Sequence, residues 1–365
     1  MLNQKALSKL CKGDSVLHFL LLKKCELKTS STGQKQFLLL EVGDQSTSLT
    51  AFMWNNYEEH LRYLTPGCLI KIAGMVDEYK GQFNIKINRI RQATLQDGVS
   101  AEDFIPKSTR ELPVMERELQ ARIEKIETPC LRDLMHIILS GEAYSKFIRV
   151  PAGKSWHHSY LHGLLEHTLE IVRICDLMCD IHPEARRDLL ICGAILHDFG
   201  KIEELTFEQG FDYSEKGKLL GHIVIAAMTV SEKTSLVPGF PESLKNQLIH
   251  LILSHQGKLE FASPVTPKTL ESIILYQADE LSAKTNAYKS AIRAEANGIN
   301  RWTKYLPLIA SALYIPEDFE NENSERENSE KENSERENSA EPEKEDTETS
   351  GLQNIEDISN EPVLD

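Results

Sequence analysis

The hydrophobic pattern of this chain changes its period once, and this change constrains the fold more than any other feature. Up to about residue 97, short segments alternate apolar and polar residues and are separated by turn residues, as β-strands are. From about 110 to 312, apolar residues recur at intervals of three and four, which is typical of packed helices. From about 316 onward, apolar residues are nearly absent until Leu352. We therefore expect a β domain, a helical domain and a tail.

The first region, 12–97, predicts a small barrel. A polar, helix-like stretch at 57–64 separates the third and fourth strands, and Lys80-Gly81 predicts a tight hairpin between the fourth and fifth. This order suits a Greek-key barrel of the OB type, although the number of strands is equally compatible with another small barrel or sheet. The expected strands are Ser15–Leu22, Phe37–Val42, Ser48–Trp54, Leu69–Val76 and Phe83–Ile90.

The second region, 114–312, predicts an all-helical domain that follows a linker at 98–113. Thr266-Pro267 is expected to begin its last long helix, because a threonine hydroxyl caps free amides and proline fits a first turn. The periodic segments are 114–140, 161–178, 185–196, 219–230, 244–253 and 270–288.

The charge of the chain is concentrated in the segment 317–365. The formal net charge is −15, and this segment holds 19 acidic and 4 basic residues. The rest of the chain has 37 acidic and 37 basic residues, so overall charge does not exclude a nucleic-acid partner. Near-repeats of Asn-Ser-Glu-Arg/Lys-Glu-Asn begin at 323, 328 and 333. We expect this acidic tail to be disordered, either as a passive solubilising segment or to repel nucleic acid.

Composition excludes membrane and secreted classes. No apolar run approaches the ~20 residues of a membrane helix. The first 12 residues lack the pattern of a signal peptide. The seven cysteines include no Cys-x-x-Cys pair and are odd in number, which indicates reduced thiols in a cytoplasmic protein. Cys175 and Cys179 are expected to be core residues.

Nine of the twelve histidines lie between 157 and 255. His167 precedes the pair His197-Asp198 by 30 residues, and Asp279 follows Asp198 by 81, which places these side chains on three helices. Neighbouring residues on a straight helix point about 100° apart, but Gly200 is expected to end this helix and allow both side chains to reach one ion. Two imidazoles and two carboxylates suit Mn²⁺, Fe²⁺ or Co²⁺ at least as well as Zn²⁺.

Other residues extend this predicted metal site. His222 and His255 could each bind a second ion, and two ions about 3.5–4 Å apart would hold a phosphoryl group and activate water. Lys201 could offset charge on a phosphate oxygen as a catalytic group, although a solvent-facing lysine is equally compatible with its position. Three residues before the first ligand could line a substrate path or form a plain polar loop: Lys154, His157 and His158.

The pattern His167, His197-Asp198, Asp279 resembles the signature of the HD superfamily of metal-dependent phosphohydrolases, and Ala194–Ile202 is similar to its central helix. The resemblance narrows to the YhaM-type 3′→5′ exoribonucleases in three further segments: Trp156–Thr168, Gly217–Ile223 and Leu253–Pro264. It covers about 10–310. It implies an OB domain followed by an HD domain, single-stranded RNA as substrate, and nucleoside 5′-monophosphates as products.

Two places depart from the family pattern. The run Ser159–His162 replaces an aromatic-then-glycine run, and His255-Gln256 replaces a His-His pair. The acidic tail also lies outside the pattern. We expect none of these departures to touch the proposed ligands.

The barrel is expected to provide a track for a single strand, in which basic residues contact the backbone and aromatic residues stack on bases. Alternation places Thr50, Phe52 and Trp54 on one face, which is compatible with the outer surface or, as is more usual for an aromatic, with the core. The aromatic candidates are Phe37, Phe52, Trp54, Tyr79 and Phe83, and the basic ones are Lys35, Lys71, Lys80 and Lys86.

The residues themselves support metal-assisted phosphoester hydrolysis, whereas RNA and the 3′→5′ direction come from the resemblance. Mn²⁺ is the expected metal, with Co²⁺, Fe²⁺ or Mg²⁺ as alternatives, and two ions are expected. One alternative function is an HD phosphohydrolase of small nucleotides with a regulatory barrel. Another is a single-strand RNA-binding protein with a structural metal site. Single-stranded DNA as a substrate and a homo-oligomeric assembly stay open.

Overall fold

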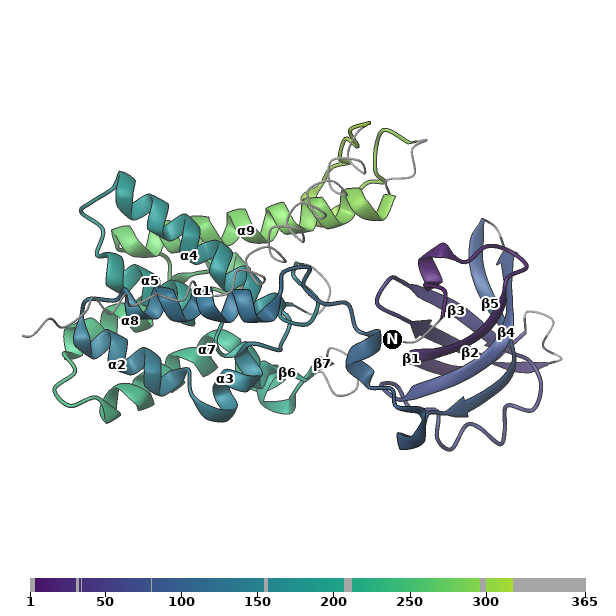
Figure 1. Cartoon of the computed structure of the whole chain (residues 1–365). Coiled ribbons are helices and arrows are strands. Elements are labelled where there is room, and N and C mark those ends of the chain that lie inside the picture. Colours follow the sequence, from purple (N-terminus) through teal and green to yellow (C-terminus); the bar gives the residue numbers. More distant parts are fainter. Residues whose placement is uncertain are drawn as a thin grey trace, which may run out of the picture. The chain divides into compact units, whose positions relative to one another are not determined.

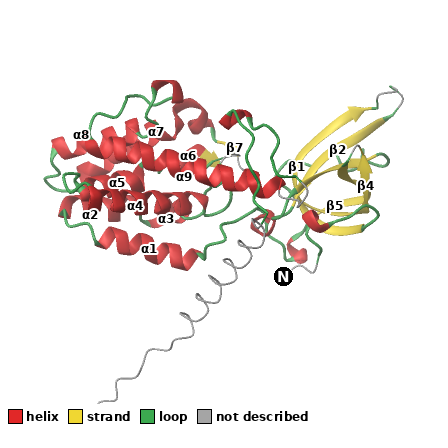
Figure 2. Cartoon of the chain, turned by 90° about the horizontal axis from the view of Figure 1, so that it is seen from above, coloured by secondary structure: helices red, strands yellow, loops and turns green. Residues whose placement is uncertain are grey.

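The computed structural model describes residues 4–30, 33, 35–79, 81–153, 157–206, 212–295 and 300–317. The chain divides into two compact units, 1–290 and 291–365. The first unit contains a β-barrel and a helical domain, each considered separately below (Figures 1 and 2). Three earlier predictions lie outside the described residues: the substrate contacts Lys80 and Lys154, and the acidic tail except for Glu317.

The barrel contains five described strands: β1 (Ser15–Thr29), β2 (Gln36–Gly43), β3 (Ser48–Met53), β4 (Leu69–Tyr79) and β5 (Gln82–Gln92). They close in the order β1-β2-β3-β5-β4, with β3 parallel to β5 and the other neighbours antiparallel. The barrel closes because the long strand β1 pairs with β4 through its first half and with β2 from Leu21 onward, where the register shifts between Leu22 and Lys24. This OB-like arrangement confirms the predicted fold of the first region.

The segment between β3 and β4 differs from the prediction. Its residues form successive turns and not a helix. The amides of His60 and Tyr63 donate three residues back, to the carbonyls of Tyr57 and His60, and the amides of Leu61 and Leu64 donate four residues back to the same two carbonyls. These bonds form single turns that do not continue into an α-helix.

The helical domain follows the predicted periodicity. Its described helices are α1 (Leu112–Glu124), α2 (Pro129–Ile138), α3 (Gly141–Phe147), α4 (Gly163–Ile181), α5 (Arg187–Leu196), α6 (Lys201–Glu204), α7 (Glu215–Lys233), α8 (Glu242–Ser254) and α9 (Leu270–Glu295). The predicted helical segment 114–140 is divided at 125–128, because Pro129 begins α2 as a new helix. Two short strands that we did not predict, β6 (Leu205–Thr206) and β7 (Asp212–Tyr213), pair with each other.

Helix α9 begins at Leu270, as the periodic segment 270–288 predicted. The expected start signal Thr266-Pro267 was wrong, because a different threonine caps the helix. The hydroxyl of Thr269 accepts a hydrogen bond from the amide of Ser272 (3.1 Å), and the hydroxyl of Ser272 accepts one from the amide of Thr269 (2.9 Å). This reciprocal pair satisfies backbone donors of the first turn.

Helix α5 forms the centre of the helical domain. Every residue from Leu189 to Leu196 is buried, and α5 packs against α2, α4 and α8 (Figure 1). A helix that is apolar on all sides is stable only inside a core. The residues that follow α5 are therefore held deep in the domain.

Two other observations complete the fold. No helix among the described residues is long and apolar enough to cross a membrane. All seven cysteines are described and none forms a disulfide, and Cys175 and Cys179 are buried as predicted.

Gly200 allows the turn between α5 and α6 to approach α7 closely. A Cβ atom on Gly200 would lie 2.0 Å from the carbonyl oxygen of His222 and 2.9 Å from the amide nitrogen of Ala226. Both are backbone atoms, which a side-chain rotation cannot move away. Only glycine fits here, and its lack of a side chain sets the distance between the turn after α5 and the backbone of α7 at His222.

We therefore predict that Gly200→Ala lowers the free energy of unfolding by about 3 kcal/mol, as in an overpacked core. Gly153→Ala is the control, because its nearest contact would be an ordinary 3.5 Å to the carbonyl oxygen of His157. Urea unfolding in EDTA measures both variants. A Gly200→Ala protein as stable as the control would contradict the close packing described here.

Candidate metal centre

The pair His197-Asp198 lies in a turn at the buried end of α5. The helix ends at Leu196, and the amide of Phe199 donates back to the carbonyl of Leu196 (3.1 Å). The amide of Lys201 then donates to the carbonyl of Asp198 (3.0 Å), which leads into α6. The expected helix end near Gly200 is confirmed, and both side chains of the pair point toward the same space.

Four imidazoles surround the carboxylate of Asp198. Its Oδ2 lies 3.3 Å from Nε2 of His197 and 3.7 Å from Nε2 of His167. Its Oδ1 lies 3.2 Å from Nε2 of His222 and 3.6 Å from Nε2 of His255. The sixth predicted ligand, Asp279 on α9, places Oδ1 3.1 Å from Nε2 of His167. The structure thus brings together all six residues that the sequence analysis singled out as metal ligands.

These six residues form two adjoining groups, within each of which the nearest ligand atoms lie within 4.8 Å of one another. Because the two oxygens of Asp198 face different imidazoles, this carboxylate lies where it can serve both groups. The two groups are His167, His197 and Asp279, and Asp198, His222 and His255.

The outward nitrogen of each imidazole is anchored, so that Nε2 faces the centre. Nδ1 of His197 donates to the carbonyl of Ala194 (2.8 Å), and Nδ1 of His255 donates to that of Ile252 (2.7 Å). Carbonyl oxygens only accept, so these two rings carry their proton on Nδ1 and leave Nε2 as an acceptor.

His222 is anchored by a carboxylate. Gly221 interrupts α7 with a positive φ of 72°, and the amide of His222 is free to donate to Glu204 (2.9 Å). Nδ1 of His222 lies 3.0 Å from the same Glu204 oxygen. A carboxylate behind a histidine in this way orients the ring as a metal ligand.

Several atoms at the centre fit a bound cation. Nε2 of His167, His197 and His222 and Oδ1 of Asp198 are buried and have no hydrogen-bond partner among the described residues. Unpaired buried polar atoms are costly, and a divalent cation would satisfy all of them at once. Imidazole nitrogens and carboxylate oxygens together are a donor set that suits divalent transition metals.

Protonation of the centre is compatible with this fit. Burial and the neighbouring His158 lower the pKa of His167 well below its ordinary value, so its ring is neutral. Burial lowers the pKa of His255 to about 4. Burial would raise the pKa of Asp198, but Lys201, His197 and His222 together outweigh it and hold that pKa well below its usual range. Burial would lower the pKa of His197, but the Asp198 carboxylate outweighs it and raises that pKa. Neutral imidazoles and an ionised carboxylate are the forms that bind a metal, so a cation beside His197 would displace a proton.

Lys201 is buried, with 7% of its surface exposed, and its Nζ lies 2.5 Å from Oδ2 of Asp198. The alternative of a solvent-facing lysine was wrong. The cation reaches the centre because α6 begins at Lys201, one turn after Asp198.

His157 and His158 lie beside the first ligand. Their ring centroids are 5.0 and 5.2 Å from that of His167. His158 is 1% exposed, which a plain polar loop would not produce, and burial lowers the pKa of His157 to about 2. Both rings therefore border the centre, His157 as a neutral ring and His158 as a buried one.

Sequence reasoning missed several residues around the ligands. They are Glu204, which contacts His222, Ser282, which contacts His167, and Glu170, which contacts Ser282. These contacts form only in the tertiary fold. The expectation that family departures avoid the ligands was also wrong, because the Gln256 amide lies 3.2 Å from Nε2 of His255. Its position next to His255 in the sequence was the available signal.

An aromatic cluster lies on the outside of the barrel. Phe37 stacks on Trp54 with ring centroids 4.3 Å apart, and Phe52 lies 5.9 Å from Phe37. Ala51 and Met53 are buried while Trp54 is 41% exposed, so the core interpretation of this strand face was wrong. Phe52 and Trp54 line a cavity of about 330 Å³ together with Thr50, Asp77, Tyr79, Gln82, Phe83, Asn84 and Lys86.

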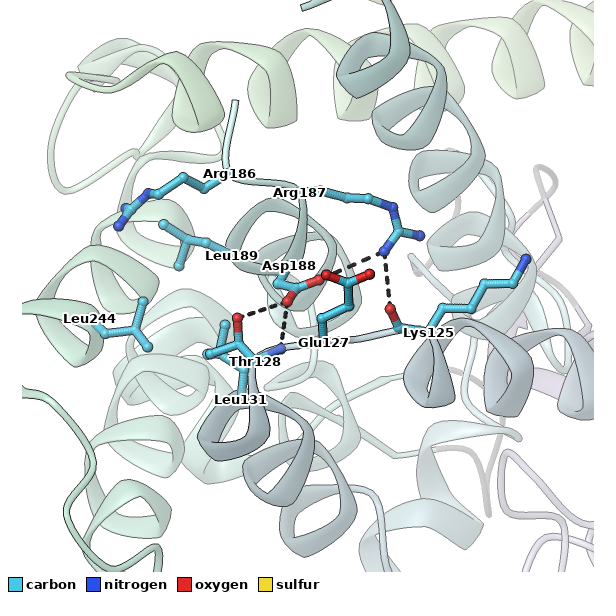
Figure 3. A pocket seen from close by; sticks show the side chains of 9 residues that line it. All are labelled: Lys125, Glu127, Thr128, Leu131, Arg186, Arg187, Asp188, Leu189 and Leu244. Atoms are coloured by element: carbon cyan, nitrogen blue, oxygen red, sulfur yellow. Dashed lines mark hydrogen bonds and ion pairs between the residues drawn. The ribbon is translucent and has the colours of Figure 1, made fainter. Parts of the chain in front are cut away.

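A second cavity of about 760 Å³ lies at the beginnings of α2 and α5 (Figure 3). Its lining contains none of the six predicted ligands. Asp188 accepts hydrogen bonds from the hydroxyl and amide of Thr128 (2.7 Å each), and Arg187 pairs with Asp176 (2.8 Å). These charges are engaged in joining helices, so the centre around Asp198 is the candidate site.

Comparisons with known proteins agree with this geometry. Residues 164–284 match the family model described as the HD domain. The chain is 31% identical to the 3′-5′ exoribonuclease YhaM of Bacillus subtilis (strain 168), over 77% of this chain and 88% of the relative. It is 33% identical to that of Listeria monocytogenes serotype 4b (strain CLIP80459), over 77% and 89%.

Among solved structures, a domain of replication protein A from Methanococcus maripaludis is 21% identical, with a TM-score of 0.21 over 24% of this chain and 93% of that chain. The two curated relatives match both in identity and in coverage, and the HD domain model spans residues from α4 to α9. The chain belongs to the family of YhaM 3′-5′ exoribonucleases.

Proposed function

We propose that this metal-dependent exoribonuclease removes nucleotides from the 3′ end of single-stranded RNA at a centre of two divalent cations, releasing nucleoside 5′-monophosphates. One observation carries the proposal: Nε2 atoms of four anchored histidines converge on both oxygens of one buried carboxylate. We assign the ligand roles to His167, His197, Asp198, His222, His255 and Asp279.

Mn²⁺ is the metal we propose, because neutral imidazoles mixed with carboxylates suit this ion. Bound divalent cations would polarise the scissile phosphodiester and lower the pKa of water toward about 7. The protein itself supplies the orientation. Asp198 offers one oxygen to each group of ligands, and Lys201 compensates the charge of this carboxylate in a buried site.

The residues beside the centre are placed to contact the 3′-terminal nucleotide of the substrate. The pKa of His157 of about 2 keeps its ring neutral, so it can bind a substrate oxygen through N–H without adding charge. We assign His157 and His158 to the path of the substrate, with Lys154 as a further contact. Lys201 is proposed as the catalytic cation that approaches a phosphate oxygen.

The aromatic cluster on the barrel, together with Tyr79 and Phe83 of the adjoining cavity, is suited to stacking on unpaired bases. Trp54, Tyr79 and Phe83 are 41, 69 and 43% exposed around one cavity, and exposed rings of this kind stack on bases of any sequence. Lys86 lies at the same cavity, where it pairs with Asp77 (2.6 Å). We propose that this cluster binds the RNA strand upstream of the cleaved end.

The domain boundaries 12–97, 98–113, 114–312 and 317–365 complete the proposal. We place the protein in the cytoplasm, where seven unpaired cysteines remain reduced.

Removal of the shared carboxylate tests the centre. We predict that Asp198→Asn lowers exonuclease activity by more than about 100-fold and reduces the number of Mn²⁺ ions bound, since even residues behind the ligands contribute 10–100-fold. Equilibrium dialysis of EDTA-treated protein measures the bound metal. Asp133→Asn, an exposed carboxylate on α2, is the matched control. Full activity of a folded Asp198→Asn protein would refute the proposed centre.

The substrate is tested with 5′-labelled RNA. We predict a ladder that shortens progressively from the 3′ end of single-stranded RNA, dependence on Mn²⁺, and loss of cleavage in EDTA. Single-stranded DNA of the same sequence is run in parallel. Intact RNA together with hydrolysis of free nucleotides would favour the small-nucleotide phosphohydrolase, and binding without hydrolysis of either would favour the RNA-binding protein.

The role of the barrel is tested with Trp54→Ala. Loss of one stacked base is worth about 1–3 kcal/mol, so we predict that KM for an RNA of about 16 nucleotides rises roughly 5- to 150-fold. The kcat for a dinucleotide should change little, because such a substrate leaves no base for the barrel. Leu17→Ala, another exposed apolar residue of the barrel, is the control. An unchanged KM for the long RNA would exclude Trp54 from the binding surface.

A further inference from the structure

The four imidazoles of the centre differ in how the proton on Nδ1 is fixed. Behind His197 and His255 stand backbone carbonyls, and behind His222 stands the carboxylate of Glu204. These groups accept hydrogen bonds and so fix the proton on Nδ1. Behind His167 stands a hydroxyl, that of Ser282, at 3.0 Å. A hydroxyl both donates and accepts, so it does not by itself determine which nitrogen of His167 is free for a metal.

Glu170 resolves this ambiguity. The hydroxyl of Ser282 donates to Oε2 of Glu170 at 2.6 Å, the short distance of a charge-assisted bond. Because the only proton of the hydroxyl is used in this bond, the Ser282 oxygen is left to accept from Nδ1–H of His167. The lone pair of His167 is then on Nε2, which lies 3.1 Å from Oδ1 of Asp279.

The two intermediate residues also link two ligand-bearing helices. Glu170 lies three residues after His167 on α4, and Ser282 lies three residues after Asp279 on α9, so each shares a helix face with a ligand. Ser282 is 4% exposed. The bond between Glu170 and Ser282 therefore joins α4 to α9 one turn away from the point where His167 and Asp279 meet.

We propose that Glu170 and Ser282 form a hydrogen-bond relay, Glu170–Ser282–His167, that positions His167 as a metal ligand. Both are positioning residues, since neither reaches the centre itself. This inference rests on the proposed function, because it assigns a role toward the proposed cations.

The far end of the relay lies beside another histidine. Nε2 of the buried His158 lies 3.3 Å from Oε2 of Glu170. His158, Glu166 and Glu170 bring ligand atoms within 4.8 Å of one another, which by distance alone would also admit a cation. The relay is favoured because the same oxygen of Glu170 already accepts from Ser282. A cation bound by Glu170 would be detected in the test below as one bound ion fewer in Glu170→Gln.

The test measures Mn²⁺ binding without RNA, by competition with a chromogenic chelator on EDTA-stripped full-length protein. Ser282→Ala should weaken Mn²⁺ binding by about 10–100-fold, the usual effect of losing a partner behind a metal-ligating histidine. Glu170→Gln should weaken it less, because an amide oxygen still accepts from the hydroxyl. The double variant should resemble Ser282→Ala, because Glu170 acts through Ser282. Ser290→Ala, at an exposed serine of α9, should bind as wild type does.

Two further measurements separate positioning from catalysis and from misfolding. The Mn²⁺ concentration for half-maximal exonuclease activity should rise in Ser282→Ala by the same factor as the dissociation constant, while kcat at saturating Mn²⁺ stays within about threefold of wild type. The unfolding temperature of Ser282→Ala in EDTA should lie only a few degrees below that of Ser290→Ala, because a buried hydrogen bond is lost, and unfolding should stay cooperative.

The outcomes are distinct. Wild-type affinity in a folded Ser282→Ala protein would overturn the relay while leaving the metal centre intact. Loss of one bound ion in Glu170→Gln, with unchanged affinity for the others, would also overturn it and indicate a cation at His158, Glu166 and Glu170. A wild-type protein that binds no Mn²⁺ would refute the proposed centre itself, and the relay with it.

Discussion

The buried carboxylate of Asp198 is the interaction on which the rest of the site depends. Four imidazoles and one ammonium group lie within 3.7 Å of its two oxygens. An ionised carboxylate inside a protein is tolerable only when it is paired or binds a metal. The surrounding helices are arranged to meet this requirement. Lys201 neutralises part of the charge. The converging Nε2 atoms add no positive charge when they act as acceptors, so divalent cations can neutralise the rest.

The helical domain supplies the positions through packing rather than through local sequence. Helix α5 is buried from Leu189 to its end at Leu196, so the turn that carries Asp198 begins inside the core. Gly200 lets α7 approach that turn, and the interruption of α7 at Gly221 frees the amide of His222 to bind Glu204. The same glycines that would weaken an ordinary helix are therefore what brings the second group of ligands to the first.

The sequence predicted the parts of this site that have a local signature. The adjacent pair His197-Asp198 followed by Gly200 indicated a helix end with two metal ligands, and the spacing to His167 placed the next ligand on another helix. Ser282 and Glu170 had no such signature, because they meet across 112 residues and only in the folded chain. For the barrel, strand alternation grouped Phe52 with Trp54 but could not distinguish the outer face from the core.

The central claim is that two divalent cations lie on either side of Asp198. The most direct measurement is anomalous diffraction from crystals of the full chain grown with Mn²⁺. We predict two anomalous peaks about 3.5–4 Å apart, both in contact with Asp198. One peak should lie among His167, His197 and Asp279, and the other beside His222 and His255. A single peak away from Asp198, or no peak at these residues, would contradict the account.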